Sequence, residues 1–220
     1  MASKLIGSDS LNQNAAYQHV RLRLLSEGML GKPDLSKVIG LMARSSGEGV
    51  TTTAVGLALA INARSAGSVL LIDANPSSQR VSDLLDCKAP YLQANDVSSD
   101  NFNIDNYIVH AGEPALNVLS LAKLENSQTC SSSEFSLCWE TLKKRYDTII
   151  MDIGAWSTEA PLGWIEQVDD LILVLDGNHT TREMLSHFNK TIDRCGCKLS
   201  GFIMNKHERP IPDFVYKLIS

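Results

Sequence analysis

A short apolar run that leads into a turn rich in glycine and serine constrains the fold of this chain more than any other feature. A strand that passes through a tight loop into a helix N-terminus is the arrangement that holds phosphates, because loop N–H groups and the helix dipole both point at the anion. The sequence therefore predicts a phosphate-binding loop between a buried strand and a helix. The apolar run is residues 38–43, the turn is residues 44–50, and the helix begins in residues 51–54.

The predicted loop departs from the P-loop pattern G-x-x-x-x-G-K-[ST] at one position. Gly49 and Thr51 occupy the places of the last glycine and the hydroxyl residue, but Val50 stands where the pattern has lysine. That lysine reaches the β- and γ-phosphates in a standard P-loop, whereas the hydroxyl binds Mg²⁺. The loop thus keeps the residues that give it its shape and loses its charge.

Composition restricts the classes of protein to which the chain can belong. With 220 residues, 44% hydrophobic and 20% charged, it has the composition of one ordinary globular unit. A net charge of −5 and the lack of any lysine or arginine block argue against nucleic acid as a partner.

Localisation is predicted from apolar runs and cysteines. No apolar run approaches the roughly 18–20 residues that span a bilayer, and the N-terminal residues have no signal-peptide core. The five cysteines are scattered along the chain, which is typical of reduced thiols rather than of a disulfide framework. We therefore expect a cytoplasmic protein.

Strand-like and helix-like segments alternate along most of the chain, which predicts an α/β fold with a doubly wound, mainly parallel sheet flanked by helices. We expect a polar tail and an amphipathic helix in residues 1–34, and one α/β domain in residues 35–220. Gly67 is expected to cap the helix after the loop, and Leu137 to point into the core. The expected strands are 37–43, 69–73, 116–121, 146–152, 171–175 and 201–205, with a strand-like patch at 107–109. The expected helices are 12–27, 51–64, 81–85, 134–145, 164–168 and 181–195.

Two apolar strands end in a carboxylate, Asp73 and Asp152. Ligands of such sheets bind at the carboxyl ends of the strands, so these residues should converge with the loop on one edge. An acid in this position holds Mg²⁺ or orients the attacking group, although strand-ending aspartates also cap turns. We expect Thr51, Asp73 and Asp152 at a metal and Asp73 and Asp152 in residual catalysis, whereas Asp176 is interpreted as a turn residue.

Together these features resemble the deviant-Walker ATPases related to MinD and ParA, and most closely the bacterial tyrosine kinases (BY-kinases) of capsule and exopolysaccharide export. The resemblance extends from about Ala15 to the C-terminus. It implies the fold of P-loop NTPases and a nucleotide, ATP or ADP with Mg²⁺, as cofactor. It also implies that Asn205 contacts the adenine edge. The nucleotide-binding residues implied are Gly47, Glu48, Gly49, Val50, Thr51, Thr52 and Asn205.

The chain departs from the family pattern at the positions that would take part in phosphoryl transfer. Val50 replaces the lysine, Asn75 stands in place of a second acid, and Tyr216 alone remains where the family has a C-terminal tyrosine cluster. In the N-terminal motif that builds ring-shaped oligomers in the family, Tyr17 and Arg21 remain, while a Glu and an Arg are lost. The losses indicate a pseudokinase with weak or no phosphoryl transfer.

Three functions stay open on these grounds. The first is a subunit that regulates or scaffolds exopolysaccharide synthesis and export. It would sit at the inner membrane through a polysaccharide co-polymerase or chain-length regulator, as a homo- or hetero-oligomer. The second is an active ATPase or tyrosine autokinase in which Arg44 replaces the missing cation. The third is a MinD/ParA-like positioning ATPase.

Overall fold

The computed structural model describes residues 15–31, 35–64, 67–75, 80–99, 101–113, 115–121, 133–156, 162–194 and 199–206. Tyr216, the C-terminal segment and three of the cysteines (Cys130, Cys195 and Cys197) lie outside the described residues. The strands are β1 (Lys37–Ala43), β2 (Val69–Asp73), β3 (Tyr91–Leu92), β4 (Ile108–Ala111), β5 (Leu116–Leu121), β6 (Thr148–Ala155), β7 (Asp170–Asp176) and β8 (Leu199–Asn205). The helices are α2 (Ala15–Ser26), α3 (Val50–Asn62), α4 (Arg80–Leu85), α5 (Ala94–Val97), the 3₁₀ turn η1 (Ile104–Asn106), α6 (Ser133–Arg145), α7 (Leu162–Ile165) and α8 (Arg182–Arg194).

The strands form a single sheet in the order β3-β5-β2-β6-β1-β7-β8, and β4 pairs with β5. All neighbours on this path are parallel, and among the described strands only β4 runs antiparallel to its partner. This confirms the predicted doubly wound, mainly parallel sheet. Because β2, β6, β1 and β7 are consecutive in space, their carboxyl ends lie side by side at one edge, where ligands of such sheets bind.

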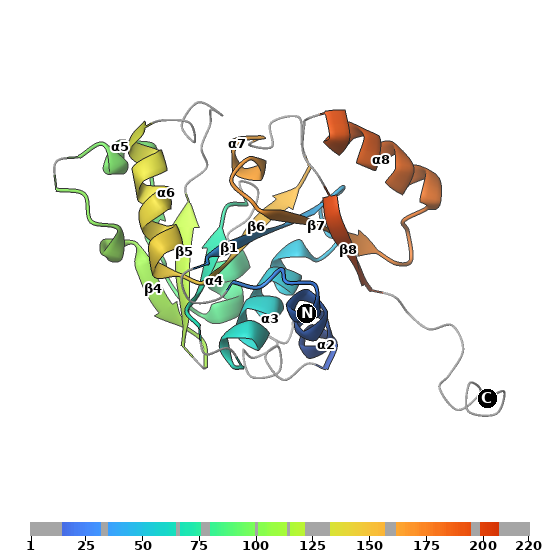
Figure 1. Cartoon of the computed structure of the whole chain (residues 1–220), viewed down its shortest axis with the longest axis horizontal. Coiled ribbons are helices and arrows are strands. Elements are labelled where there is room, and N and C mark those ends of the chain that lie inside the picture. Colours follow the sequence, from blue (N-terminus) through green and yellow to red (C-terminus); the bar gives the residue numbers. More distant parts are fainter. Residues whose placement is uncertain are drawn as a thin grey trace.

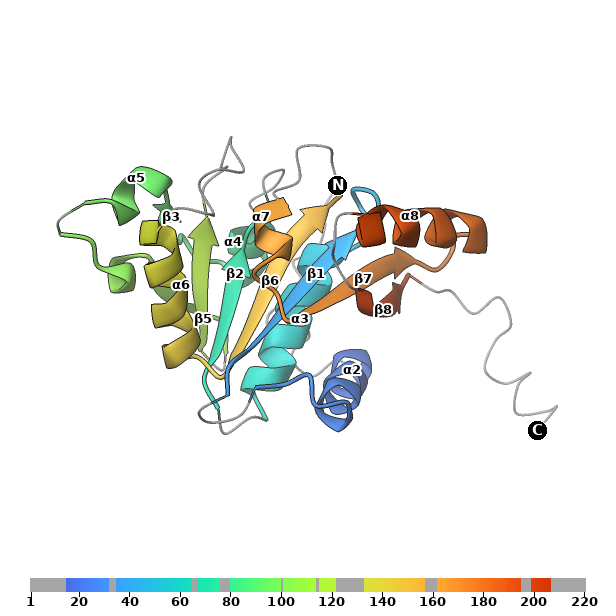
Figure 2. The same ribbon diagram turned by 45° about the horizontal axis from the view of Figure 1, so that its top comes forward.

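Helices cover both faces of the sheet (Figures 1 and 2). Helices α6, α7 and α8 lie on one face, over a core that includes Trp139, Trp164 and Phe188. Helices α2, α3 and α4 lie on the other face, over a core built largely from the alanine- and leucine-rich α3. The central strands read as unbroken apolar runs because both of their faces are buried.

An aromatic contact helps to pack helix α2 on α3, beside apolar residues of α2 such as Leu24. The ring of Tyr17 lies against Gly56, where an added Cβ would be 2.4 Å from the ring. Tyr17 also forms a hydrogen bond with the Thr53 side chain, and the Thr53 hydroxyl donates to the Gly49 carbonyl at 2.8 Å. The first helix is thus connected through α3 to the glycine-rich loop. No helix among the described residues is long and apolar enough to cross a membrane.

Two local predictions are wrong. Helix α3 ends at Asn62 with Ala63 as its C-cap, so Gly67 caps nothing. Its missing Cβ instead leaves room for the Asp147 carboxylate, which would lie 2.6 Å from an added Cβ. Leu137 is 72% exposed, because the phase of α6 directs Cys138, Trp139 and Leu142 inward. These errors concern helix phase and helix ends, which apolar spacing fixes only loosely.

The remaining differences concern strand ends and the least regular region. Strand β6 begins at Thr148 and continues beyond Asp152 to Ala155, so the acid lies inside the strand rather than at its end. The stretch 86–114 contains β3, α5, η1 and β4, of which the sequence predicted only a patch at 107–109 that overlaps β4. Short elements with few residues leave little periodicity to read.

Candidate functional site

The loop between β1 and α3 has the geometry that binds anions. Gly47 and Gly49 have φ angles of 86° and 93°, in the left-handed region that favours glycine. Helix α3 begins immediately afterwards at Val50, and within the described residues no side chain caps its N-terminus. The first-turn N–H groups and the helix dipole therefore face the space enclosed by the loop. Thr51 and Thr52 lie in this first turn, as predicted.

Glu48 holds the loop in shape from inside. Its carboxylate accepts the Ser45 N–H at 2.9 Å and the Asp176 N–H at 3.2 Å, and the residue is only 6% exposed. One carboxylate therefore closes the loop and fastens it to the end of β7. Glu48 borders the cavity but uses both of its oxygens for the backbone.

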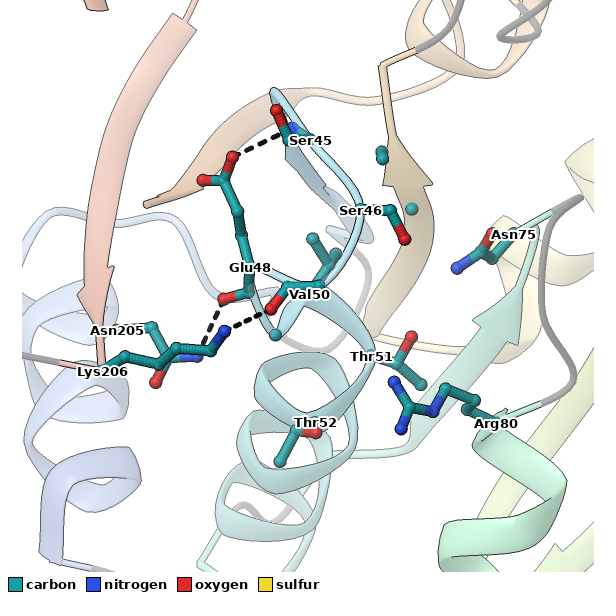
Figure 3. A pocket seen from close by; sticks show the side chains of 14 residues that line it. Ser45, Ser46, Glu48, Val50, Thr51, Thr52, Asn75, Arg80, Asn205 and Lys206 are labelled. Atoms are coloured by element: carbon teal, nitrogen blue, oxygen red, sulfur yellow. Dashed lines mark hydrogen bonds between the residues drawn. The ribbon is translucent and has the colours of Figure 1, made fainter. Parts of the chain in front are cut away.

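The end of β8 is fastened to the same loop from outside (Figure 3). The Asn205 side-chain amide donates to the Glu48 carbonyl at 2.9 Å, and the Lys206 ammonium donates to the Gly47 carbonyl. Lys206 also lies 3.4 Å from a carboxylate oxygen of Asp176. Asn205 thus supports the loop in this structure, and its role at an adenine edge remains a prediction.

A cavity of about 480 Å³ opens beside the loop, within the range of small-molecule sites. Every nucleotide-binding residue predicted from the sequence borders it. Val50 contributes an apolar wall that is 6% exposed, at the place where a P-loop lysine would enter. The full lining is Ser45, Ser46, Gly47, Glu48, Gly49, Val50, Thr51, Thr52, Asn75, Arg80, Gly154, Ala155, Asn205 and Lys206.

Two lining residues with positive charge were missed. Lys206 directly follows Asn205 at the carboxyl end of a parallel strand, so the rule that ligands bind at these strand ends could have found it. Arg80 begins α4, seven residues beyond Asp73, and nothing in the sequence pattern connects it to the loop. Arg44, the replacement cation in the alternative of an active enzyme, borders an adjacent pocket with Asp176 and His179 instead of the main cavity.

Asp73 and Asp152 are direct neighbours on adjacent strands, paired in register between β2 and β6. Both are buried, with exposures of 3% and 0%. Burial and, to a smaller extent, repulsion from Asp152 raise the pKa of Asp73 to about 7, against an opposing hydrogen bond from the Asn75 N–H. Burial also raises the pKa of Asp152 to about 6, against hydrogen bonds from Thr51 and from the Gly154 N–H.

One oxygen of this pair has no partner. Asp152 Oδ2 is buried and accepts no hydrogen bond from any of the described residues. A buried carboxylate oxygen without a partner is costly, and a hard cation is the ligand that would satisfy it. In the part of the chain that the structure describes, no group of three metal-binding side chains occurs. Mg²⁺ needs few protein ligands when nucleotide phosphates and waters complete its shell, and the oxygens of Thr51, Asp73 and Asp152 are of the kind that it prefers. Of the three residues, Thr51 borders the cavity, whereas the two aspartates are buried beside it.

Asp176 behaves as the predicted turn residue. Its carboxylate accepts the Asn178 N–H at 3.0 Å and lies 3.2 Å from the His179 imidazole and 3.4 Å from Lys206. These partners, first the Asn178 N–H, hold the pKa of Asp176 below its usual value. The two tryptophans near β6 have structural roles: Trp164 is buried, and Trp156 packs edge-to-face on Phe188 with ring centroids 5.7 Å apart.

No model of a protein family matches the sequence, and no curated protein matches it. Solved structures do match. The VpsO kinase domain is 22% identical over 91% of this chain and 96% of that chain, with a TM-score of 0.74. The kinase domain of the Escherichia coli tyrosine kinase ETK is 18% identical over 96% and 86%, with a TM-score of 0.74. MinD from Pyrococcus horikoshii OT3, solved with Mg-ADP, is 19% identical over 84% and 77%, with a TM-score of 0.58.

These matches cover most of both chains in each pair, although the sequences have diverged widely. They agree with the mainly parallel sheet flanked by helices. The chain therefore has the P-loop NTPase fold that bacterial tyrosine-kinase domains share with MinD-type ATPases.

Proposed function

We propose that this chain is a degenerate BY-kinase-like protein that binds a nucleotide with Mg²⁺ but transfers phosphate weakly or not at all. The observation that supports binding is the unsatisfied oxygen of Asp152 beside Asp73 and Thr51, next to an anion-binding loop. A buried pair of carboxylates without a cation destabilises the fold, so its presence at a phosphate-binding loop suggests a ligand. Mg²⁺, when bound with the nucleotide, would neutralise phosphate charge.

Loss of catalysis is supported by the residues around the cavity. Val50 brings no charge to the phosphates, and Asn75 cannot accept a proton as a carboxylate does. Phosphoryl transfer depends on positioning and on stabilising developing negative charge, so a missing lysine in a sheltered site costs several kcal/mol, of the order of 10³-fold in rate. Binding survives more easily, because loop N–H groups and the helix dipole remain.

We further propose that the protein regulates or scaffolds exopolysaccharide export from the inner membrane, through contact with a polysaccharide co-polymerase. Support for this comes from the motif resemblance and from the fold shared with the VpsO and ETK kinase domains. A subunit of this kind needs an intact fold and partner surface rather than turnover. Co-purification with the chain-length regulator, unchanged by Asp152→Asn, would separate this role from any dependence on the metal site.

The deciding experiment is calorimetric titration of the purified protein with MgATP and MgADP, with Asp152→Asn as a comparison variant. We expect dissociation constants in the micromolar range for the wild type and at least tenfold weaker binding for the variant, which loses a metal ligand. A parallel assay of ATP hydrolysis should show turnover far below the roughly 1–100 s⁻¹ of active kinases.

Two results would contradict the proposal. No heat up to millimolar nucleotide would remove nucleotide binding and leave a purely structural protein. Turnover in the range of active kinases, abolished by Asp152→Asn, would instead establish an enzyme with an atypical loop.

A further inference from the structure

Because Val50 replaces the P-loop lysine, the cavity lacks the positive charge that would face the phosphates of a nucleotide. A bound nucleoside triphosphate brings up to four negative charges next to two buried carboxylates. Mg²⁺ offsets two of these charges, so a protein cation is needed for the rest. Of the residues that border the cavity, two carry a positive charge, Arg80 and Lys206.

The Lys206 side chain already binds other groups of the protein. Its ammonium donates to the Gly47 carbonyl and lies 3.4 Å from the Asp176 carboxylate, on the β8 side of the loop. Figure 3 shows it beside Asn205, across the N-terminus of α3 from Arg80. Moving it onto a phosphate would break both contacts. Lys206 therefore positions the loop, and its charge is largely balanced by Asp176.

Arg80 is in the opposite situation. It is exposed, and its side chain forms no hydrogen bond or ion pair with any other described residue. In Figure 3 its guanidinium extends from α4 toward the first turn of α3 and ends beside Thr51. Asn75 and Ser46 lie across the same open space.

We propose that Arg80 contacts the terminal phosphates of the bound nucleotide and supplies from α4 the positive charge that position 50 lacks. A guanidinium presents a planar fork of N–H donors that matches two phosphate oxygens, and these charge-assisted hydrogen bonds are about twice as strong as neutral ones. The proposal deepens the function proposed above and rests on it. Its consequence is selectivity: the site distinguishes nucleotides by the number of their phosphates.

The test compares three nucleotides on three proteins. MgATP, MgADP and AMP are titrated calorimetrically into the wild type, Arg80→Ala and Arg182→Ala. Arg182 is a matched control, because it is also an exposed arginine at the first position of a helix, α8, and does not border the cavity. We expect Arg80→Ala to weaken ATP binding about tenfold or more, ADP less and AMP within twofold. Arg182→Ala should leave all three unchanged.

A second arm separates phosphate contact from contact with the base or sugar. Inorganic tripolyphosphate with Mg²⁺ is titrated into the same proteins, and Arg80→Lys is added to keep the charge while removing the fork. We expect Arg80→Ala to weaken tripolyphosphate as much as ATP, and Arg80→Lys to fall in between. Thermal melts confirm that each variant is folded.

The outcomes are distinguishable. Equal ATP affinity of the wild type and Arg80→Ala would overturn this inference and leave nucleotide binding intact. An equal loss for ATP, ADP and AMP would also overturn it, since the arginine would then not read the phosphates. A wild type that binds no nucleotide would overturn both this inference and the proposed function.

Discussion

Two acid-bearing strands at the same edge of the sheet differ sharply in their surroundings. At β6, Asp152 is fully buried beside Asp73, and its Oδ2 has no partner among the described residues. At β7, Asp176 accepts a backbone N–H and lies next to His179 and Lys206. The pKa of Asp152 is raised by burial, whereas hydrogen bonds and neighbouring cations lower that of Asp176.

The difference separates a structural carboxylate from a functional one. Asp176 is also largely buried, but its carboxylate has hydrogen-bond and ion-pair partners, so it can hold a turn and a loop in place at little cost. A buried pair without a cation lowers the stability of the fold, and proteins keep such a pair where a ligand compensates for it. In sequence the two cases look alike, since each is an apolar run with an aspartate.

The largest expected effect is on stability as a function of pH in metal-free buffer. In the folded protein Asp73 and Asp152 have pKa values of about 7 and about 6, above the ordinary value of 3.8. The folded state therefore keeps protons that the unfolded state loses, so the free energy of unfolding falls as pH rises from about 4 to about 7. We expect a loss of roughly 2–4 kcal/mol, measurable as a melting temperature about 5–12 °C lower at pH 8 than at pH 5.

The variant Asp73→Asn provides the comparison for this measurement. It removes one charge of the pair with little change in volume, so the difference in melting temperature between pH 5 and pH 8 should shrink by at least half. Millimolar Mg²⁺ with ADP should also reduce that difference in the wild type. A wild type and a variant with the same pH dependence would show that the two carboxylates are not the cause.

A smaller effect on stability is expected where the end of β8 is hydrogen-bonded to the loop. Gly49 has a φ of 93°, and an added Cβ would lie 2.1 Å from the Asn205 side-chain nitrogen. Gly49→Ala should therefore strain the backbone and displace Asn205 from the Glu48 carbonyl, with a loss of about 2 kcal/mol. Gly201→Ala is the control, since nothing lies within 4 Å of its added Cβ. Its stability should change by less than about 0.5 kcal/mol in urea unfolding. Equal losses would mean that the Asn205 contact is unimportant.

Much of the fold was predictable because its strongest signals are long and periodic. The apolar runs of β1, β2, β5 and β7 are buried on both faces, so their sequences alone predicted strands in a covered parallel sheet. Short elements such as β3 and η1 carry too few residues for any period. The predicted C-cap of α3 was wrong, because Gly67 lacks a side chain for a different reason: the Asp147 carboxylate approaches it closely.

The site was predictable where it follows from strand ends and from the loop. The loop residues Gly47 to Thr52 line one cavity, and Asp73 and Asp152 pair with each other on adjacent parallel strands, as strand order alone leads one to expect. Neither aspartate borders the cavity, and their role at a metal stays a prediction. Arg80 could not be predicted in this way, because it begins helix α4 and does not lie at the end of a strand. The opposite electrostatics of Asp152 and Asp176 were also hidden, since partners such as Lys206 come from strands that are distant in sequence.

The smallest effect on stability is expected for Lys206→Ala, which tests whether Lys206 holds the loop in place or binds the ligand. Its side chain is about half exposed, so Lys206→Ala should change the melting temperature by no more than about 2 °C. The contact with the Gly47 carbonyl should nevertheless hold the loop closed, and hydrogen exchange of residues 44–50 should become faster in the variant. Affinities for ATP and ADP should fall by the same factor, because Lys206 acts on the loop rather than on a particular phosphate.

Lys190→Ala is the control for that variant, because Lys190 is exposed on α8 and does not border the cavity. A loss in Lys206→Ala that is much larger for ATP than for ADP would place Lys206 on the terminal phosphate. Lys206 would then bind the ligand, contrary to the structural role in the loop assigned to it above. Unchanged loop exchange would show instead that Glu48 alone closes the loop, through its hydrogen bonds to the Ser45 and Asp176 N–H groups.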